Sequence, residues 1–149
     1  MSEHVATIDW SRGDQSFTDG VYSRGHDWRF DGGAVVRGSS APPVPGSDPA
    51  GVDPEEALVA AVSACHMLFF LAYAAKAGLA VDRYTDAASG TLGRDDRGKV
   101  SITRVTLRPD IRWGGEAPSA EVLDDLHHRA HEACYLANSI RGEVVIEPV

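Results

Sequence analysis

Hydrophobic and polar positions alternate in the first third of the chain, which predicts β-strands there. Three strands are expected, at residues 4–10, 21–30 and 34–37. In the second strand His26, Trp28 and Phe30 share one face, and Asp31-Gly32-Gly33 supplies the turn to the third. The first third of the chain is therefore expected to be rich in β-structure.

Residues 38–52 hold four of the eight prolines, so neither a helix nor a strand is expected to persist there. Too little chain precedes this segment to fold alone. We therefore interpret it as a loop within one domain that spans residues 1–149.

A long helix is predicted next, from Asp53 to about Lys76. Asp53 is an N-cap acceptor, Pro54 occupies the first helical position, and Gly78 follows as a stop signal. Apolar residues cover every side of this helix, which predicts a buried helix at the centre of the fold. Its most apolar stretch, residues 57–71, is short of the roughly 20 residues that cross a bilayer.

The second half of the chain predicts further strands and one more helix. Strands are expected at 84–92, 99–113 and 143–146, and a helix at 119–138. The alternation changes phase between Ile102 and Val105, which indicates a β-bulge. Because successive strands can pair as hairpins, we expect an α+β fold with antiparallel sheets packed on the first helix.

The composition restricts the classes of partner. The chain has 149 residues, of which 22 are acidic and 14 basic, and its net charge of -8 argues against a nucleic-acid partner. The first ten residues, MSEHVATIDW, do not have the pattern of a signal peptide, so we expect a cytoplasmic protein that does not enter a membrane.

Cys65 and Cys134 are the only cysteines, and each falls on a predicted helix. In a reducing compartment two cysteines form a structural disulfide only rarely, which leaves a reactive pair, a metal site or two inert buried thiols. A reactive pair suits peroxide chemistry. One thiolate attacks the O–O bond, and the second thiol captures the sulfenic acid before it is oxidised further.

A buried thiol needs a nearby cation to ionise, and Arg24 is our candidate. Glu55 would orient this arginine. Ten residues of regular helix, however, separate Glu55 from Cys65 by about 15 Å along the axis. Three alternatives remain: an irregular helix start, a long arginine that bridges the gap, or a site that combines two subunits.

Histidines near the cysteines offer other chemistry. His127, His131 and Cys134 follow each other at helical spacing, which makes a zinc site an alternative function. His66 is next to Cys65 in sequence but points about 100° away around a helix. It is therefore a poor general base for that thiol, and a hydrogen bond inside the core is the alternative.

Two segments, DPEEALVAAVSACH and AHEACYLANS, resemble the OsmC/Ohr family, the osmotically inducible and organic hydroperoxide resistance proteins. The resemblance extends to the order of the elements and so to nearly the whole chain. It implies an OsmC-like fold, an intertwined homodimer with sites at the subunit interface, and a thiol-dependent peroxidase. The substrates implied are organic hydroperoxides and, more weakly, hydrogen peroxide.

The resemblance also assigns roles to residues. Cys65 matches the peroxidatic cysteine, Cys134 the resolving cysteine, Glu55 the glutamate and Arg24 the arginine, with Arg12 as the fallback. No cofactor is implied, and an external dithiol reduces the disulfide. An apolar wall for the organic tail is expected from Leu58, Val62, Met67, Leu68, Phe69 and Phe70.

The chain departs from the family's usual pattern at two positions. His66 stands after the first cysteine, where phenylalanine is usual, and Tyr135 stands after the second, where proline is usual. A non-enzymatic domain with a small-ligand pocket at the dimer interface is a further alternative function.

Overall fold

The computed structural model describes residues 2–149, and its contacts cluster into two compact units. The first unit extends to Ala57 and the second is Leu58–Val149. The boundary falls inside a continuous helix, α1 (Pro54–Lys76). That the chain forms a single domain stays a prediction.

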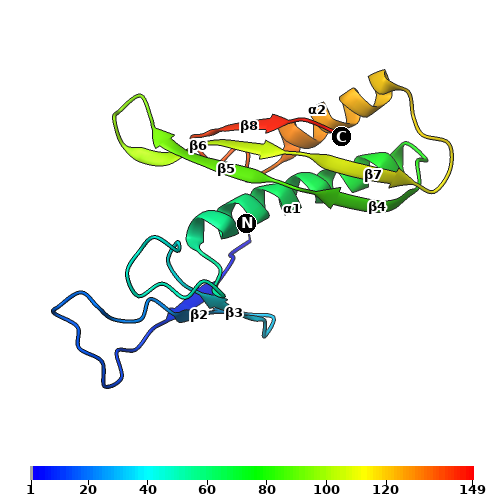
Figure 1. Ribbon diagram of the computed structural model, residues 1–149. Helices are drawn as coiled ribbons and strands as arrows, with labels where there is room; N and C mark the ends of the chain where they lie inside the picture. The colour runs from blue at the N-terminus through cyan, green and yellow to red at the C-terminus, as the bar shows by residue number, and fades with distance from the viewer. Residues whose placement is uncertain (1) are drawn as a thin grey trace. The chain divides into compact units, whose positions relative to one another are not determined.

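The first unit contains a three-stranded antiparallel sheet (Figure 1). Its strands are β1 (Ala6–Asp9), β2 (His26–Phe30) and β3 (Val35–Gly38), in that order. All three predicted strands are confirmed, although residues 21–25, before β2, are irregular. The turn from β2 to β3 depends on Gly33, whose φ of 86° lies in the left-handed region that favours glycine.

The proline-rich segment that follows β3 is a series of turns, as predicted. At its end, the Val52 backbone pairs with β3 through hydrogen bonds to Arg37 and Ser39. The chain then enters α1 through reciprocal hydrogen bonds between Asp53 and Glu56. The Asp53 carboxylate accepts from the Glu56 N–H at 2.7 Å, and the Glu56 carboxylate accepts from the Asp53 N–H at 3.2 Å. These bonds satisfy donors that the helix start leaves free.

Helix α1 ends where predicted, because Gly78 has a φ of 77° and reverses the chain. One face of the helix is buried, and it carries Val62, His66, Phe70 and Ala74. Another face is apolar yet exposed, and it carries Ala60, Ala61, Ala64, Leu68, Ala72 and Ala75. The prediction of an enclosed helix is therefore wrong for a single chain, since the neighbouring elements cover only one side.

Helix α1 is also longer than the apolar stretch read from the sequence. With 23 residues and a mean hydropathy of 2.0 over its most apolar window, it meets the length and composition of a membrane span. The core helix of a soluble protein meets the same criterion, and α1 carries the buried face described above.

The second unit contains two sheets (Figure 1). One pairs β4 (Val81–Asp86) with β7 (Pro109–Trp113), and the other has the order β5 (Ser89–Arg94), β6 (Val100–Leu107), β8 (Glu143–Ile146). The two long strands predicted here are thus four shorter ones. The pairing of β6 with β8 is parallel, which corrects the expectation of purely antiparallel sheets.

The predicted bulge is confirmed between β5 and β6. Thr91 pairs with Arg104 and Leu92 with Ile102, so Thr103 has no partner in the register. The extra residue changes which side chains of β6 face inward. This explains the change of phase in the sequence.

Helix α2 (Ala120–Ala133) is shorter than predicted. It starts at Ser119, whose side chain accepts from the Val122 N–H, and it ends at Cys134, whose backbone is extended (φ -68°, ψ 109°). The prediction that the helix continues to residue 138 is wrong, because residues 135–139 form turns. Cys134 therefore caps the helix instead of lying within it.

Two hydrophobic clusters hold the second unit together. Phe70 and Ala74 of α1 pack with Leu126 and Ala130 of α2, under side chains of β4 and β7. Val62 of α1 packs under β6 and β8. The α+β class is confirmed, and α1 is the element shared by both clusters.

Candidate functional site

Arg24 lies in the irregular segment just before β2, and backbone and side-chain contacts both fix it. Its N–H donates to the carbonyl oxygen of Gly46 at 2.8 Å. Its Nε donates to the Pro45 carbonyl oxygen at 3.2 Å, and its guanidinium lies 3.9 Å from the centre of the Tyr22 ring and donates to the Tyr22 hydroxyl. The guanidinium is thus stacked on an aromatic face, which suits arginine.

Arg24 and Glu55 line the same cavity, which lies entirely in the first unit and has a volume of about 440 Å³. Its other lining residues are Trp10, Tyr22, His26, Ser39, Ser40, Ala41, Val44 and Pro54. The sequence reasoning thus selected two residues that share one cavity. Among residues 2–149 the structure has no ion pair between Arg24 and Glu55, so the orienting role of Glu55 is not present in the single chain.

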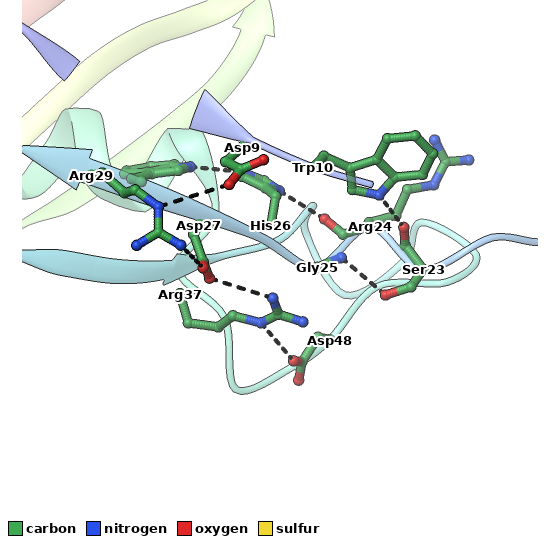
Figure 2. A network of polar contacts seen from close by, with 11 residues as sticks. Asp9, Trp10, Ser23, Arg24, Gly25, His26, Asp27, Arg29, Arg37 and Asp48 are labelled. Carbon is green, nitrogen blue, oxygen red and sulfur yellow. Dashed lines mark hydrogen bonds and ion pairs between the residues drawn. The ribbon is translucent and has the colours of Figure 1, made fainter. Parts of the chain in front are cut away.

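A network of ion pairs lies beside this cavity, on the strands of the same sheet (Figure 2). Arg29 contacts Asp27 at 2.9 Å and Asp9 at 3.8 Å. Arg37 contacts Asp27 at 3.6 Å and Asp48 at 3.7 Å, which connects β2, β3 and the proline-rich loop. These groups are partly exposed, so each pair contributes little to stability. The Arg37–Asp48 pair is the one that connects the proline-rich loop to the sheet.

The fallback arginine, Arg12, has different surroundings. Its guanidinium donates to the carbonyl oxygen of Gln15 at 3.2 Å, and it does not line the cavity that contains Glu55. The geometry therefore favours Arg24 over Arg12.

Both thiols are free and belong to the second unit. Cys65 is partly buried on α1, whereas Cys134 is fully buried and its Sγ accepts from the Ala137 N–H at 3.4 Å. Burial raises the pKa of the Cys134 thiol, and the adjacent Cys65 thiol raises it further, against the effect of the Ala137 hydrogen bond. The two cysteines that the sequence paired are thus neighbours in space.

Helices α1 and α2 also carry a pair of buried histidines that contact each other. His66 of α1 and His127 of α2 are 1% and 4% exposed, their rings are stacked at an interplanar angle of 8°, and His66 Nε2 lies 3.1 Å from His127 Nδ1. The pKa of each imidazole is lowered to about 4, mainly by burial. The charges of His127 and His131 add to this lowering at His66, whereas those of Asp124 and Asp86 oppose it at His127. His66 thus makes the core hydrogen bond given as its alternative role.

The zinc alternative required His127, His131 and Cys134 to share one helical face. Cys134 lies beyond the last turn of α2, and His127 points to His66. In the part of the chain that the structure describes, no group of three or more His, Cys, Asp or Glu side chains is arranged to hold a metal ion. The structure gives this alternative no support.

The residues of the expected apolar wall do not line one surface in the structure. Val62 and Phe70 are fully buried in the core, so they are unavailable to a ligand, and Leu68 is 63% exposed. The cavity beside Arg24 instead takes its apolar lining from aromatic and small residues of the first unit, such as Trp10 and Val44. The alternation placed Trp10 on a predicted strand but gave no information on its packing, and no pattern in the sequence marked Val44.

The fold is an α+β arrangement in which antiparallel strands pack on a long helix that carries a cysteine, next to a second cysteine at the end of another helix. The family model described as OsmC-like protein matches residues 46–149. The chain therefore belongs to the OsmC-like protein family, as the resemblance indicated. No curated protein matches the chain.

Several solved structures are similar to this one. An OsmC-like protein of unknown function from Vibrio cholerae is 50% identical, with full coverage of both chains and a TM-score of 0.96. An organic hydroperoxide resistance protein from Elizabethkingia anophelis is 19% identical over 99% of this chain and 94% of its own, with a TM-score of 0.72. The organic hydroperoxide resistance protein OhrB of Bacillus subtilis is also 19% identical, over 99% and 96%, with a TM-score of 0.68. The last two similarities establish the fold.

Proposed function

We propose that this chain is a thiol-dependent peroxidase that reduces organic hydroperoxides and, more weakly, hydrogen peroxide. The observation that carries the proposal is the adjacency of the Cys65 and Cys134 thiols in a member of the OsmC-like family. Cys65 is the more accessible of the two and is the nucleophile. Cys134 is buried beside it and serves as the resolving thiol.

The proposed reaction has two steps on the protein. The Cys65 thiolate attacks the distal peroxide oxygen, the O–O bond breaks, and the products are the Cys65 sulfenic acid and, after protonation, an alcohol. The Cys134 thiol then attacks the sulfenic sulfur and water leaves, which forms the Cys65–Cys134 disulfide. An external dithiol reduces this disulfide and is itself oxidised. A reducing cytoplasm supplies such a reductant.

We further propose that the working form is a homodimer in which Arg24 and Glu55 of one subunit meet Cys65 and Cys134 of the other. Helix α1 is regular from Pro54 onward, so an irregular start does not bring Glu55 to Cys65. The exposed apolar face of α1 is the kind of surface that a second copy covers. In such a site Arg24 stabilises the thiolate and Glu55 orients Arg24.

Turnover with a dithiol tests the proposal. With dithiothreitol as the reductant, the wild type should consume an organic hydroperoxide such as cumene hydroperoxide faster than hydrogen peroxide. Cys65→Ser should abolish turnover, whereas Cys134→Ser should still form the sulfenic acid, detectable by dimedone labelling. If Cys65→Ser consumes peroxide as fast as the wild type, the proposal fails.

A non-enzymatic domain that binds a small ligand is the second candidate function. The cavity of about 440 Å³ beside Arg24 is the observation that favours it. An inert thiol pair, together with saturable binding of a small anionic or aromatic compound at Arg24, would support this function over the peroxidase.

A further inference from the structure

Arg24 lies outside the strands, so hydrogen bonds other than those of the sheet must fix its backbone. Residues 21–25 precede β2 and belong to no strand. The Arg24 N–H is bound to Gly46, and its carbonyl oxygen is 2.8 Å from Nδ1 of His26 (Figure 2). The His26 side chain is therefore the group that binds the carbonyl side of Arg24.

The neighbouring tryptophan determines which nitrogen of His26 carries the proton. Trp28 Nε1 lies 2.6 Å from His26 Nε2, and an indole N–H can only donate. His26 Nε2 must then accept, so in the neutral imidazole the proton is on Nδ1. His26 Nδ1–H consequently donates to the Arg24 carbonyl oxygen.

The backbone of β3 packs directly against the His26 and Trp28 side chains. Gly38 pairs with His26 in the sheet, and a Cβ atom at Gly38 would lie 2.5 Å from Trp28 Nε1 and 2.6 Å from His26 Nε2. Both distances are shorter than real Cβ contacts allow. Only glycine therefore leaves the Trp28–His26 hydrogen bond intact.

We propose that His26 is a positioning residue for Arg24, and that Trp28 holds His26 in the tautomer that this role requires. The inference rests on the proposed function, because Arg24 matters as the cation that stabilises the Cys65 thiolate. His26 lines the same cavity as Arg24, but its proposed role is to hold Arg24 and not to react with peroxide or thiol. It acts by fixing the backbone from which the guanidinium extends into the cavity that it shares with Glu55.

Two substitutions at His26 separate positioning from general stability. His26→Phe removes both hydrogen bonds, whereas His26→Asn keeps a donor near Nδ1. The second-order rate constant of Cys65 with cumene hydroperoxide should fall about tenfold in His26→Phe, because small displacements of a catalytic group have effects of this size or larger. In His26→Asn it should fall less than threefold. His128→Phe, at an exposed histidine of α2, is the matched control and should not change the rate.

A readout that a merely structural role would not move is the pH dependence of Cys65 alkylation by iodoacetamide. The profile should shift to higher pH in His26→Phe and stay unchanged in His128→Phe. If His26→Phe has the rate constant and alkylation profile of the wild type, the positioning role is wrong. If the wild type does not react with hydroperoxide at all, the proposed function fails, and the alkylation profiles still decide whether His26 places Arg24 beside the thiol.

If His26→Phe does not fold, two glycine variants provide an alternative test. Gly38→Ala should disturb the Trp28–His26 hydrogen bond, whereas Gly32→Ala, at a glycine with open space around its Cβ position, should not. Nitrogen NMR of the wild-type histidines provides the direct check. His26 protonated on Nε2 in the neutral form would overturn the inference.

Discussion

At the scale of single residues, the buried His66–His127 pair makes stability depend on pH. The pKa of each imidazole is lowered from 6.5 to about 4 in the folded chain. The unfolded chain therefore binds protons below pH 6.5 that the folded chain does not bind until about pH 4. Stability from this pair is fully present above pH 6.5 and is lost as the pH falls toward 4.

We expect the free energy of unfolding to fall by up to about 1.4 kcal/mol per pH unit for each of the two histidines within this window. Urea unfolding at pH 7, 6 and 5 measures the slope. The double variant His66→Phe/His127→Phe should flatten it, and His128→Gln should keep it. A wild-type stability that does not change between pH 7 and 5 would contradict the neutral buried pair.

The two thiols should differ in reactivity toward an alkylating reagent. Cys134 is fully buried and burial raises its pKa, whereas Cys65 is partly exposed. Because only the thiolate reacts and access limits it further, iodoacetamide at pH 7.5 should label Cys134 at least about tenfold more slowly than Cys65. Peptide mass spectrometry after timed quenching measures both rates. Equal labelling would show that Cys134 is not enclosed as described.

The contacts of single residues could be predicted only in part. Arg24 was selected from the strand pattern, with Glu55 as its partner. The resemblance assigned the same two residues, and they do line one cavity. The His66–His127 hydrogen bond joins residues 61 positions apart, and helical spacing gives no signal for such a contact. The Trp28–His26 hydrogen bond could have been predicted, because the alternation placed both residues on one face of the strand.

At the scale of the element, the start of α1 depends on the reciprocal bonds between Asp53 and Glu56. Asp53→Ala removes the acceptor for the Glu56 N–H and should lower the free energy of unfolding by about 1 kcal/mol, typical of a lost N-cap. Chemical denaturation measures the change. Glu3→Ala, at an exposed residue outside the elements, is the control and should be neutral. An unchanged stability in Asp53→Ala would mean that the cap contributes nothing.

The ends of elements were predictable where a residue type marks them. Pro54 marks the start of α1 and Gly78 follows its end. Strand β8 also starts and ends where predicted. The break between β4 and β5 was missed because Ala87 and Ala88 are not turn residues. The parallel pairing of β8 was missed because alternation in a strand of four residues does not indicate its direction.

At the scale of the whole molecule, the exposed apolar face of α1 predicts association. Only 28% of the most apolar window of this helix is buried in one chain. Such a face on a chain of the OsmC-like family is best explained by a second copy, which would also complete the proposed site.

Leu68→Glu places a charge on this face, where Leu68 is 63% exposed. It should convert the dimer to a monomer of 15.9 kDa, because a buried unpaired carboxylate opposes association. Light scattering after size exclusion measures the mass. Val122→Glu, at a 42% exposed apolar residue of α2, is the matched control and should remain dimeric. A wild type that is already monomeric would contradict the two-subunit site.

The class of fold could be predicted for the whole chain, because the order of elements and two motifs agree with one family. The burial of α1 could not be predicted, because a sequence does not indicate whether an apolar face packs against the same chain or against another one.

The most direct test of the central claim is the response of the fully reduced protein to one equivalent of organic hydroperoxide. The account predicts that both thiols are lost within each chain and that peptide mapping finds one intramolecular disulfide between Cys65 and Cys134. Both thiols remaining titratable, or oxidation of Cys65 with no such disulfide, would contradict it.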